Sequence, residues 1–373
     1  MNPSSGTHTM HTWIIKPHDT IMFRDARPFE AGASARSMPM PWPSTLAGMI
    51  RSRFGRDRTG TFTLNTKTAR AIAVRGPWVV ELNEQGEVCQ HYFPAPADAV
   101  MFKNKNVLTL RRLSPKELDS DVLSDLPEGL RPVGFDTDPG ENPGKPTQGA
   151  ALWSLEKYMA WMGTPESIQN IESIDKIGIS SFNQIARVHV QIDPKTGTAL
   201  EGHLFQTSML ETTRYKANEG YREFAFAMMV DDDKGQRVDD DGPDVMGGER
   251  RIVHVRESKK LEWKAPEVKG QIVRVVLLTP GIFEEGYKPS KIDGARVIAA
   301  SVKRPQTISG WDLEKSQPKA TRQMAPAGSV YWLEVEGDAQ QWVNTHHLSS
   351  ICDNEQDRRD GFGLIAVGQG GIR

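Results

Sequence analysis

Residues 23–55 read FRDARPFEAGASARSMPMPWPSTLAGMIRSRFG and contain the first helix that the sequence predicts. The part before Pro43 is rich in arginine, glycine and proline, which favours irregular structure. From Ser44, a suitable N-cap, apolar side chains recur at helical spacing: Leu46, Met49, Ile50 and Phe54. Gly48 lies inside this helix at a cost of about 1 kcal/mol relative to alanine, so we expect a packing or ligand contact close to its backbone.

The segments around this helix follow the order of a ferredoxin-like β-α-β-β-α-β unit. The predicted elements are a strand over 12–16, a hairpin over 71–82 and 88–93, a helix over 152–162 and a last strand over 224–230. Residues around 164–222 then form an insertion. Inside it, Val188, Val190 and Ile192 alternate with polar residues, and the DPKTG turn returns the chain through 200–205, which predicts a projecting hairpin.

The second half of the chain partly repeats this pattern. Apolar strands are predicted over 273–278 and 330–335, and Asp338 with Gln341 resembles a capping box that opens a helix. The chain ends in GFGLIAVGQGG, a short buried strand between glycines. We therefore predict an α+β protein of two ferredoxin-like domains, 1–245 and 246–373, with inserted hairpins and a C-terminal glycine-rich loop.

The charge is nearly balanced but unevenly distributed. A formal net charge of −2 argues against indiscriminate coating of nucleic acid. Basic residues gather over 24–58 and 103–116, so any RNA must be bound locally. Seven aspartates between 231 and 244 predict a solvated acidic loop that faces away from phosphate.

Cysteine usage and hydropathy exclude several classes of protein. Cys89 and Cys352 lie far apart in no C-x-x-C spacing, which supports neither a disulfide framework nor a thiolate zinc site. No run of eighteen apolar residues and no signal peptide pattern occur, so we expect a cytoplasmic protein without a membrane partner.

The sequence contains none of the common catalytic motifs. It has no G-x-x-x-x-G-K-[ST], no H-E-x-x-H and no G-x-S-x-G, which argues against NTPase, metallopeptidase and hydrolase functions and predicts a protein without cofactors. His189 and His203 with Glu201 supply too few ligands to predict a metal site. The terminal glycines either form tight turns or allow backbone N–H groups to approach phosphates.

The stretch 23–55 resembles the N-terminal signature of the third subunit of the Cmr complex, the type III-B CRISPR effector of the repeat-associated RNA-binding superfamily. Further stretches agree in the same order, and together they span nearly the whole chain: RVHVQIDPKTGTALEGHLF (187–205), GGERR (247–251), LLTPGIF and ISGWDL (within 277–313), and APAGSVYWLEV followed by GFGLIAVGQGG.

The resemblance implies two ferredoxin-like domains, a glycine-rich loop near the C-terminus and no catalytic centre. It also implies a subunit that holds the repeat-derived 5′ tag of the guide RNA (crRNA), beside the large polymerase-like subunit and a backbone subunit, with only indirect contact to target RNA. Single-stranded RNA is bound by arginines, backbone N–H groups and apolar or aromatic side chains. The candidate RNA-binding residues are Phe23, Arg24, Arg27, Arg36, Ser37, Met38, Ser44, Thr45, Gly48, Arg51, His189, Arg250, Gly361, Gly363 and Gly368.

One enzymatic alternative remains open. His18 follows the first predicted strand, where it suits a general acid or base of a metal-independent ribonuclease that cuts CRISPR repeat RNA. The sequence shows no convincing second catalytic group near it, because the adjacent Asp19 points to the opposite face if the strand continues. A general single-strand RNA binder that acts outside any complex is a third reading, which the ordered motifs disfavour.

Overall fold

The computed structural model describes residues 10–24, 34–35, 37–57, 59–105, 107–118, 121–135, 145–163, 170–216, 220–231, 241–312 and 317–372. Its chain divides into two compact units, each assembled from three segments. Unit 1 comprises Met1–Cys89, Phe182–Lys260 and Thr307–Arg322, and unit 2 comprises Gln90–Ser181, Leu261–Gln306 and Gln323–Arg373. This division does not follow the sequential boundary expected between 245 and 246, because strands from both halves of the chain build the core of unit 1.

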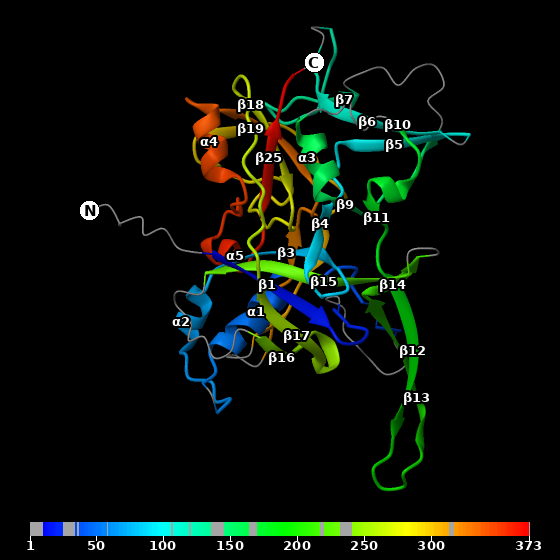
Figure 1. Ribbon diagram of the computed structural model, residues 1–373. Coiled ribbons are helices and arrows are strands. Elements are labelled where there is room, and N and C mark those ends of the chain that lie inside the picture. The colour runs from blue at the N-terminus through cyan, green and yellow to red at the C-terminus, as the bar shows by residue number, and fades with distance from the viewer. Residues whose placement is uncertain are drawn as a thin grey trace. The chain divides into compact units, whose positions relative to one another are not determined.

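Unit 1 contains an antiparallel sheet of order β3-β15-β1-β17-β16, and β14 pairs with β15 (Figure 1). The strands are β1 (Met10–Pro17), β3 (Val74–Leu82), β14 (Thr213–Lys216), β15 (Gly220–Asp231), β16 (Asp241–Met246) and β17 (Arg251–Ser258). Helix α1 (Pro43–Phe54) packs its apolar stripe on this sheet, where the Phe54 ring lies 5.3 Å from that of Trp13. The short helices α2 (Thr66–Ala71) and η3 (Gly248–Arg250) also belong to this unit.

The predicted projecting hairpin is confirmed. It consists of β12 (Asn183–Ile192) and β13 (Ala199–Glu211), which pair antiparallel and extend away from the sheet of unit 1 (Figure 1). The short strand β2 (Ser34–Ala35) pairs parallel with β13. The two small strands β21 (Trp311–Asp312) and β22 (Gln317–Pro318) form a separate antiparallel pair.

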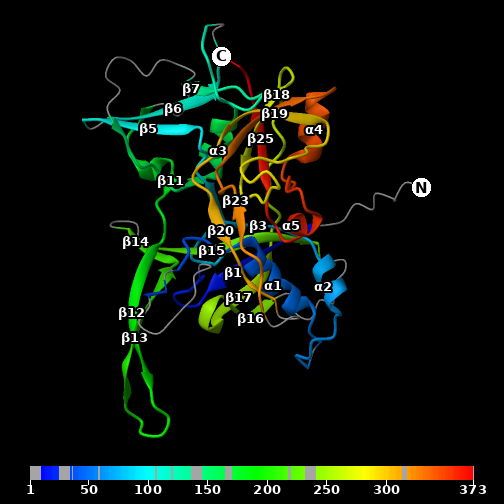
Figure 2. The same cartoon turned by 180° about the vertical axis from the view of Figure 1, so that it is seen from behind.

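Unit 2 contains an antiparallel sheet of order β19-β24-β18-β25 (Figure 2). The strands are β18 (Ile272–Leu277), β19 (Ala295–Ser301), β24 (Val330–Val335) and β25 (Ile365–Gln369). Helix α4 (Ala339–His346) begins as predicted, because the Asp338 carboxylate accepts a hydrogen bond from the Gln341 N–H at 3.0 Å. Trp342 and Val343 then bury the apolar side of this helix.

Shorter elements complete unit 2 and its borders. They are β4 (Val88–Pro94), β5 (Ala99–Asn104), β6 (Val107–Pro115), β7 (Val133–Phe135), β8 (Lys145–Pro146), β9 (Leu152–Ser154), α3 (Leu155–Gly163), β10 (Asn170–Ile171), η2 (Ile174–Lys176), β11 (Gly178–Ile179), β20 (Gln306–Ile308), β23 (Arg322–Met324) and α5 (Glu355–Arg359). The helix predicted over 152–162 is thus shorter, because Leu152 belongs to β9. Tyr158, Trp161 and Met162 are its buried residues, whereas Met159 is exposed.

The strand-rich structure agrees with the α+β class, but one strand assignment was wrong. In a β-α-β-β-α-β unit the first strand lies between the third and the fourth. Strand β15, expected as the fourth strand of the first domain, lies between β3 and β1, which is the place of a third strand, and β17 lies on the other side of β1. Pairing across more than 200 residues is set by the packed core and not by local sequence pattern.

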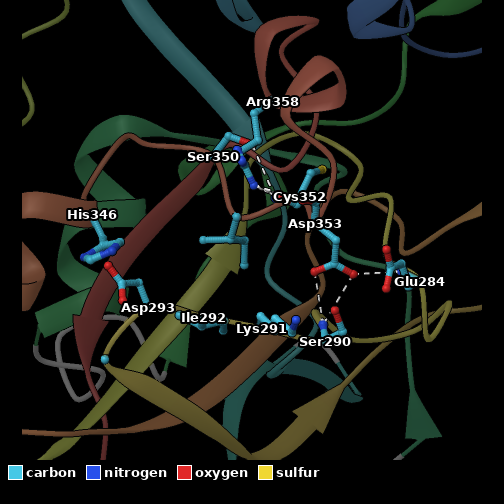
Figure 3. Close-up of a pocket in the computed structure, with 12 residues that line it drawn as sticks. Glu284, Ser290, Lys291, Ile292, Asp293, His346, Ser350, Cys352, Asp353 and Arg358 are labelled. Atoms are coloured by element: carbon cyan, nitrogen blue, oxygen red, sulfur yellow. Dashed lines mark hydrogen bonds between the residues drawn. The ribbon is translucent and has the colours of Figure 1, made fainter. Parts of the chain in front are cut away.

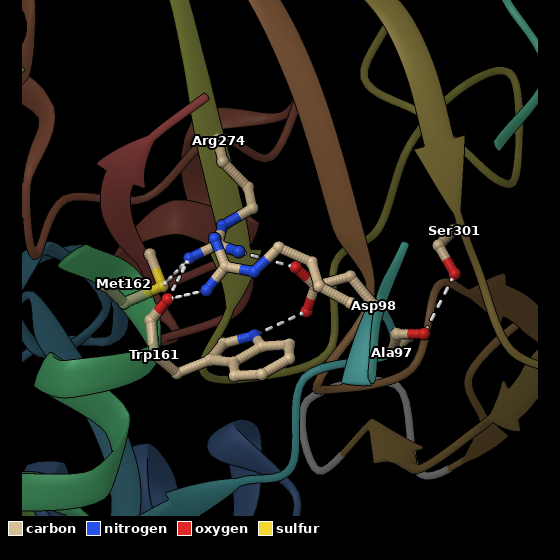
Figure 4. A network of polar contacts seen from close by, with 7 residues as sticks. Ala97, Asp98, Trp161, Met162, Arg274 and Ser301 are labelled. Atoms are coloured by element: carbon tan, nitrogen blue, oxygen red, sulfur yellow. Dashed lines mark hydrogen bonds and ion pairs between the residues drawn. The ribbon is translucent and has the colours of Figure 1, made fainter. Parts of the chain in front are cut away.

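A polar network is buried inside unit 2 (Figure 4). Arg274 Nη1 lies 2.7 Å from Asp98 Oδ2, and both side chains are almost fully excluded from solvent. The other carboxylate oxygen accepts from Trp161 Nε1 at 2.9 Å, and Arg274 Nη2 donates to the Trp161 carbonyl at 2.7 Å. Arg112 lies over the Trp161 ring at 4.3 Å and donates to the same carbonyl, so this arginine of the second basic stretch supports the core.

Candidate nucleic-acid interface

Two pieces of the 23–55 stretch are held together in unit 1. The Phe23 N–H donates to Ser37 Oγ at 3.0 Å, and the Met38 N–H donates to the Phe23 carbonyl at 2.7 Å. Gln184 of β12 donates its side-chain amide to the Ser37 carbonyl at 3.0 Å. The Phe23 ring is buried 5.6 Å from Phe226, and Ser37 is buried as well. These two residues therefore position the segment, and the Phe23 ring is unavailable for stacking on a base.

The GGERR segment (247–251) packs against residues 22–24. The Gly248 N–H donates to the Met22 carbonyl at 2.8 Å. Gly247 has a φ of +74°, and a Cβ there would lie 2.4 Å from the Met22 carbonyl oxygen, so glycine is required. Glu249 and Arg250 follow with φ of 60° and 48°, a left-handed backbone that non-glycine residues rarely adopt. This turn carries the exposed Arg250 on a segment that adjoins the exposed Arg24.

Two further arginines lie around Asp19. Arg187 Nη2 of β12 is 3.6 Å from Asp19 Oδ2. The pKa of Asp19 is lowered, first by a hydrogen bond from the Thr20 N–H and then by the charges of Arg187 and Arg251. Arg251 also donates to Glu249 Oε2 at 2.9 Å. We call Arg24, Arg187, Arg250 and Arg251 the arginine cluster. Among the described residues it holds these four cations and the carboxylates of Asp19 and Glu249, a balance that favours an anionic ligand.

Helix α1 begins two residues earlier than predicted. Trp42 occupies the N-cap and makes no side-chain capping bond, while Pro43 fills the first helical position, which its fixed φ favours. The prediction of Ser44 as N-cap was therefore wrong. Ser44 and Thr45 are half-buried in the first turn. Gly48 is exposed, and no atom of the described residues outside the helix's own backbone lies within 4 Å of the place where a Cβ would stand. Packing within the described part of the chain thus does not explain Gly48, and none of the contacts given above for the arginine cluster involves these three residues.

Other arginines of the basic stretch serve the fold. Arg51 donates from Nε and Nη2 to the Ile72 carbonyl at 3.1 and 2.8 Å. Arg53 and Arg56 lie 3.6 and 3.5 Å from the Asp244 carboxylate, which is only 5% exposed. The expectation of a wholly solvated acidic loop is therefore wrong for Asp244. Residues 232–240 of that loop, together with Arg27 and Arg36, lie outside the described residues.

The hairpin presents two different faces. On one, the His189 ring stacks on Phe205 at 5.1 Å, and His189 Nε2 lies 2.9 Å from Thr207 Oγ1. His189 is opposite Phe205 in the strand register and not opposite His203, so the two histidines do not face each other directly across the hairpin. On the other face, Val188 and Leu204 are 66% and 61% exposed. Within the part of the chain that the structure describes, no group of three metal-binding side chains is found.

The C-terminal glycines are packing positions in unit 2. A Cβ on Gly363 would lie 2.6 Å from Cys352 Sγ, and one on Gly368 would lie 2.8 Å from Met162 Cε. The Gly363 N–H donates to the Pro280 carbonyl at 2.8 Å, and the Gly361 N–H to the Arg358 carbonyl at 3.2 Å. All three glycines are buried, so their proposed role of holding phosphate is replaced by close packing and tight turns.

His18 has a neighbour that sequence reasoning missed. Its ring lies 6.3 Å from that of His254 on β17, at a cavity of about 310 Å³ in unit 1. Lys16, from the same cavity wall, pairs with Glu223 at 2.6 Å, and His254 pairs with Asp241. The two imidazoles come from strands more than 200 residues apart, so no spacing in the sequence signals this pair.

A second cavity of about 660 Å³ lies in unit 2 (Figure 3). The Asp353 carboxylate accepts from the Glu284 N–H at 2.8 Å and from the Ser290 N–H at 3.1 Å, which fixes the loop at its rim. Burial raises the pKa of the Cys352 thiol to about 12, so this thiol is protonated and unreactive at neutral pH. The cavity therefore has no cysteine nucleophile.

The family profile of CRISPR-associated protein (Cas_Cmr3) matches residues 13–370. This chain belongs to that family. The identification of the third subunit of the type III-B Cmr complex from the ordered motifs is thereby confirmed. Arg24, Arg187, Arg250 and Arg251 of the arginine cluster all lie within the matched range.

Two solved structures are similar to this Cas_Cmr3 family member at low identity. They are the type III-B Cmr-beta complex bound to cognate target RNA and AMPPnP in state 1, and the same complex bound to cognate target RNA. In each, one chain matches with 16% identity and a TM-score of 0.48, covering 86% of both chains. No curated protein sequence matches the chain. Among the described residues, no helix has both the length and the apolar character needed to cross a bilayer.

Proposed function

We propose that this chain is the subunit of a type III-B Cmr ribonucleoprotein that holds the 5′ tag of the crRNA, without catalysing a reaction itself. The observation that carries the proposal is the arginine cluster of unit 1, whose four arginines come from three separate segments of the chain. Arg24 and Arg250 stand exposed on adjoining segments, one held through Ser37 and the other through Gly247 and Gly248. Such guanidinium groups suit phosphates of single-stranded RNA.

The left-handed backbone at Glu249 and Arg250 supports the same role. Backbone strain of this kind persists where the surroundings enforce it, and it is frequent at ligand sites. Here the Gly248 N–H bond to the Met22 carbonyl holds the turn in place. Gly48 is exposed and, among the described residues, no group packs over the position of its missing Cβ, so it is a second point where an RNA backbone has room to approach α1.

We assign the hairpin β12–β13 to contact with the guide or the target strand. Its exposed valine and leucine side chains offer apolar surface to unstacked bases, and Arg187 at its base links it to the arginine cluster. The large polymerase-like subunit and a backbone subunit are the protein partners that family membership supports for this chain.

We interpret both sheets as incomplete ferredoxin-like units. In unit 2 the order β19-β24-β18-β25 is that of a β-α-β-β-α-β unit, with α4 as its second helix and no helix within 278–294 where the first would stand. In unit 1 the order β3-β15-β1-β17 fits the same scheme when α1 is its first helix. Such sheets are common platforms for single-stranded RNA.

The His18–His254 pair gives the ribonuclease alternative a specific site, but its electrostatics disfavour it. Cleavage of a phosphodiester needs cationic groups to stabilise the developing charge. Here Glu223 pairs with the Lys16 ammonium and compensates its charge, and the Asp241 carboxylate lies against His254. Repeat RNA cut by the wild type and left intact by both His18→Ala and His254→Ala would establish the alternative.

Co-purification tests the proposed function. A tagged chain expressed with the other Cmr subunits is expected to bring down those subunits and a small RNA with one uniform 5′ end. RNA with random 5′ ends would contradict tag binding. Recovery of the chain alone would contradict membership of the ribonucleoprotein in solution.

A further inference from the structure

A loop of unit 2 exposes an unusual amount of apolar surface. Residues 116–132 connect β6 to β7, and 119–120 are its only positions outside the described residues. The base of the loop is fixed: the Lys116 N–H donates to the Pro132 carbonyl at 2.9 Å, and Arg131 Nη1 lies 3.0 Å from Glu117 Oε1. These two contacts join the beginning of the loop to its end, so its base has a defined conformation.

Four large apolar side chains of this loop face solvent. Leu123 is 100% exposed, and Leu118, Val122 and Leu126 are also exposed. Single exposed apolar residues are ordinary, but a run of them on one loop marks an interaction site. A loop that served only to connect two strands would carry polar residues at these positions.

The loop borders an apolar cavity of about 820 Å³ in the same unit. Its wall includes Leu126, Leu130, Val133, Tyr287, Val302 and Met324. The charged residues in this lining are Arg131 and Lys303, and Lys303 is exposed to solvent. The cavity can therefore accept apolar side chains that a partner inserts beside the loop.

The charges around this surface select the class of partner. On the described part of the loop, the carboxylates of Glu117, Asp121, Asp125 and Glu128 stand against the cations of Lys116 and Arg131. Arg131 is engaged by Glu117 and Arg296 by Glu334, and Lys303 adds one cation at the cavity. An excess of carboxylates repels the phosphates of RNA and attracts lysine and arginine. We propose that loop 116–132 and its cavity dock another protein subunit of the complex, through a segment whose apolar side chains are flanked by basic ones; this rests on the proposed function.

The first test compares two full-length variants in binding to each purified Cmr protein subunit without RNA. Val122→Ser/Leu123→Ser/Leu126→Ser is expected to weaken binding to one subunit at least tenfold, because each leucine removed from an interface costs about tenfold or more. Asp121→Lys/Asp125→Lys/Glu128→Lys should weaken the same pair and reverse its salt dependence. Val107→Ser, which alters an exposed residue elsewhere in unit 2, is the matched control and should bind as the wild type does.

The second test places a photo-activated benzophenone residue at position 123 of the full chain within the assembled complex. A cross-link to a protein subunit at a segment rich in lysine or arginine is expected. A cross-link to RNA, or unchanged binding of both triple variants to every subunit, would overturn the proposal. Wild-type chain that binds neither RNA nor any Cmr subunit would instead defeat the proposed function, on which this surface depends.

Discussion

Arg51 donates two hydrogen bonds from one guanidinium group to the buried carbonyl of Ile72, at 3.1 and 2.8 Å. These bonds join the last turn of α1 to the C-cap residue of α2. Arg51→Ala leaves that carbonyl unsatisfied, so we expect the free energy of unfolding to fall by about 1–3 kcal/mol. The matched change Arg250→Ala, at an exposed turn, should alter it by less than about 0.5 kcal/mol. Urea denaturation measures both, and equal stability of the two variants would contradict the structural role of Arg51.

The Asp98–Arg274 pair should be the most sensitive polar contact of unit 2. Asp98→Ala leaves a buried guanidinium without its counter-ion and is expected to destabilise the protein by about 3–5 kcal/mol. Glu334→Ala, which removes an exposed partner of Arg296, should cost less than about 1 kcal/mol. Thermal unfolding of both variants tests this contrast, and a small effect of Asp98→Ala would show that the network of Figure 4 is not closed to solvent.

His347 should make the protein sensitive to acid. Burial lowers the pKa of His347 from 6.5 to about 4, and its Nδ1 accepts a hydrogen bond from the Val367 N–H at 3.2 Å. The unfolded chain therefore takes up this proton first, so stability is lost as pH falls from about 6.5 to about 4 and is unaffected above. Between pH 7 and pH 4.5, we expect the free energy of unfolding to fall by about 2–3 kcal/mol less in His347→Gln than in the wild type. Urea denaturation at pH 7 and pH 4.5 measures these free energies. An equal fall in the wild type and in His347→Gln would show that His347 does not cause the acid sensitivity.

The exposed apolar face of the hairpin should contribute to RNA affinity and not to the free energy of unfolding. Val188→Ser/Leu204→Ser changes side chains that are mostly in water, so stability should change by less than about 0.5 kcal/mol. If bases contact this face, RNA affinity of the assembled complex should fall about five- to fiftyfold, in the range of one lost stacking contact. Unaltered affinity for both guide and target would show that the hairpin has another role.

The sequence predicted correctly those helices, strands and turns that are determined by residues close together in the chain. Strand β24 follows from a short apolar run and the Asp338 cap from capping chemistry within a few residues. The β12–β13 hairpin follows from the alternation along β12 and from its turn. The place of β15 between β3 and β1 depends on pairings with segments about 150 and 215 residues distant, which no window of sequence contains.

The candidate site was predicted in part for the same reason. Arg24 and Arg250 could be selected as basic residues in family motifs, and their exposure agrees with that selection. The sequence alone did not show that Arg51 has a structural role instead, because its hydrogen bond to the Ile72 carbonyl depends on how α1 packs against α2. Likewise, the packing of Gly363 against Cys352 appears only when both segments are placed in unit 2.

The central claim is that the arginine cluster binds phosphates of the guide RNA. Each lost phosphate contact lowers the salt slope of single-strand binding by roughly 0.7, so Arg24→Ala/Arg250→Ala should lower it by about 1.4. The decisive measurement is the affinity of the assembled complex for tagged guide RNA across a salt series, with Lys259→Ala as an exposed control in unit 1 that should leave the slope unchanged. A slope equal to that of the wild type in the double variant, with the complex intact, would contradict the claim and place the RNA elsewhere.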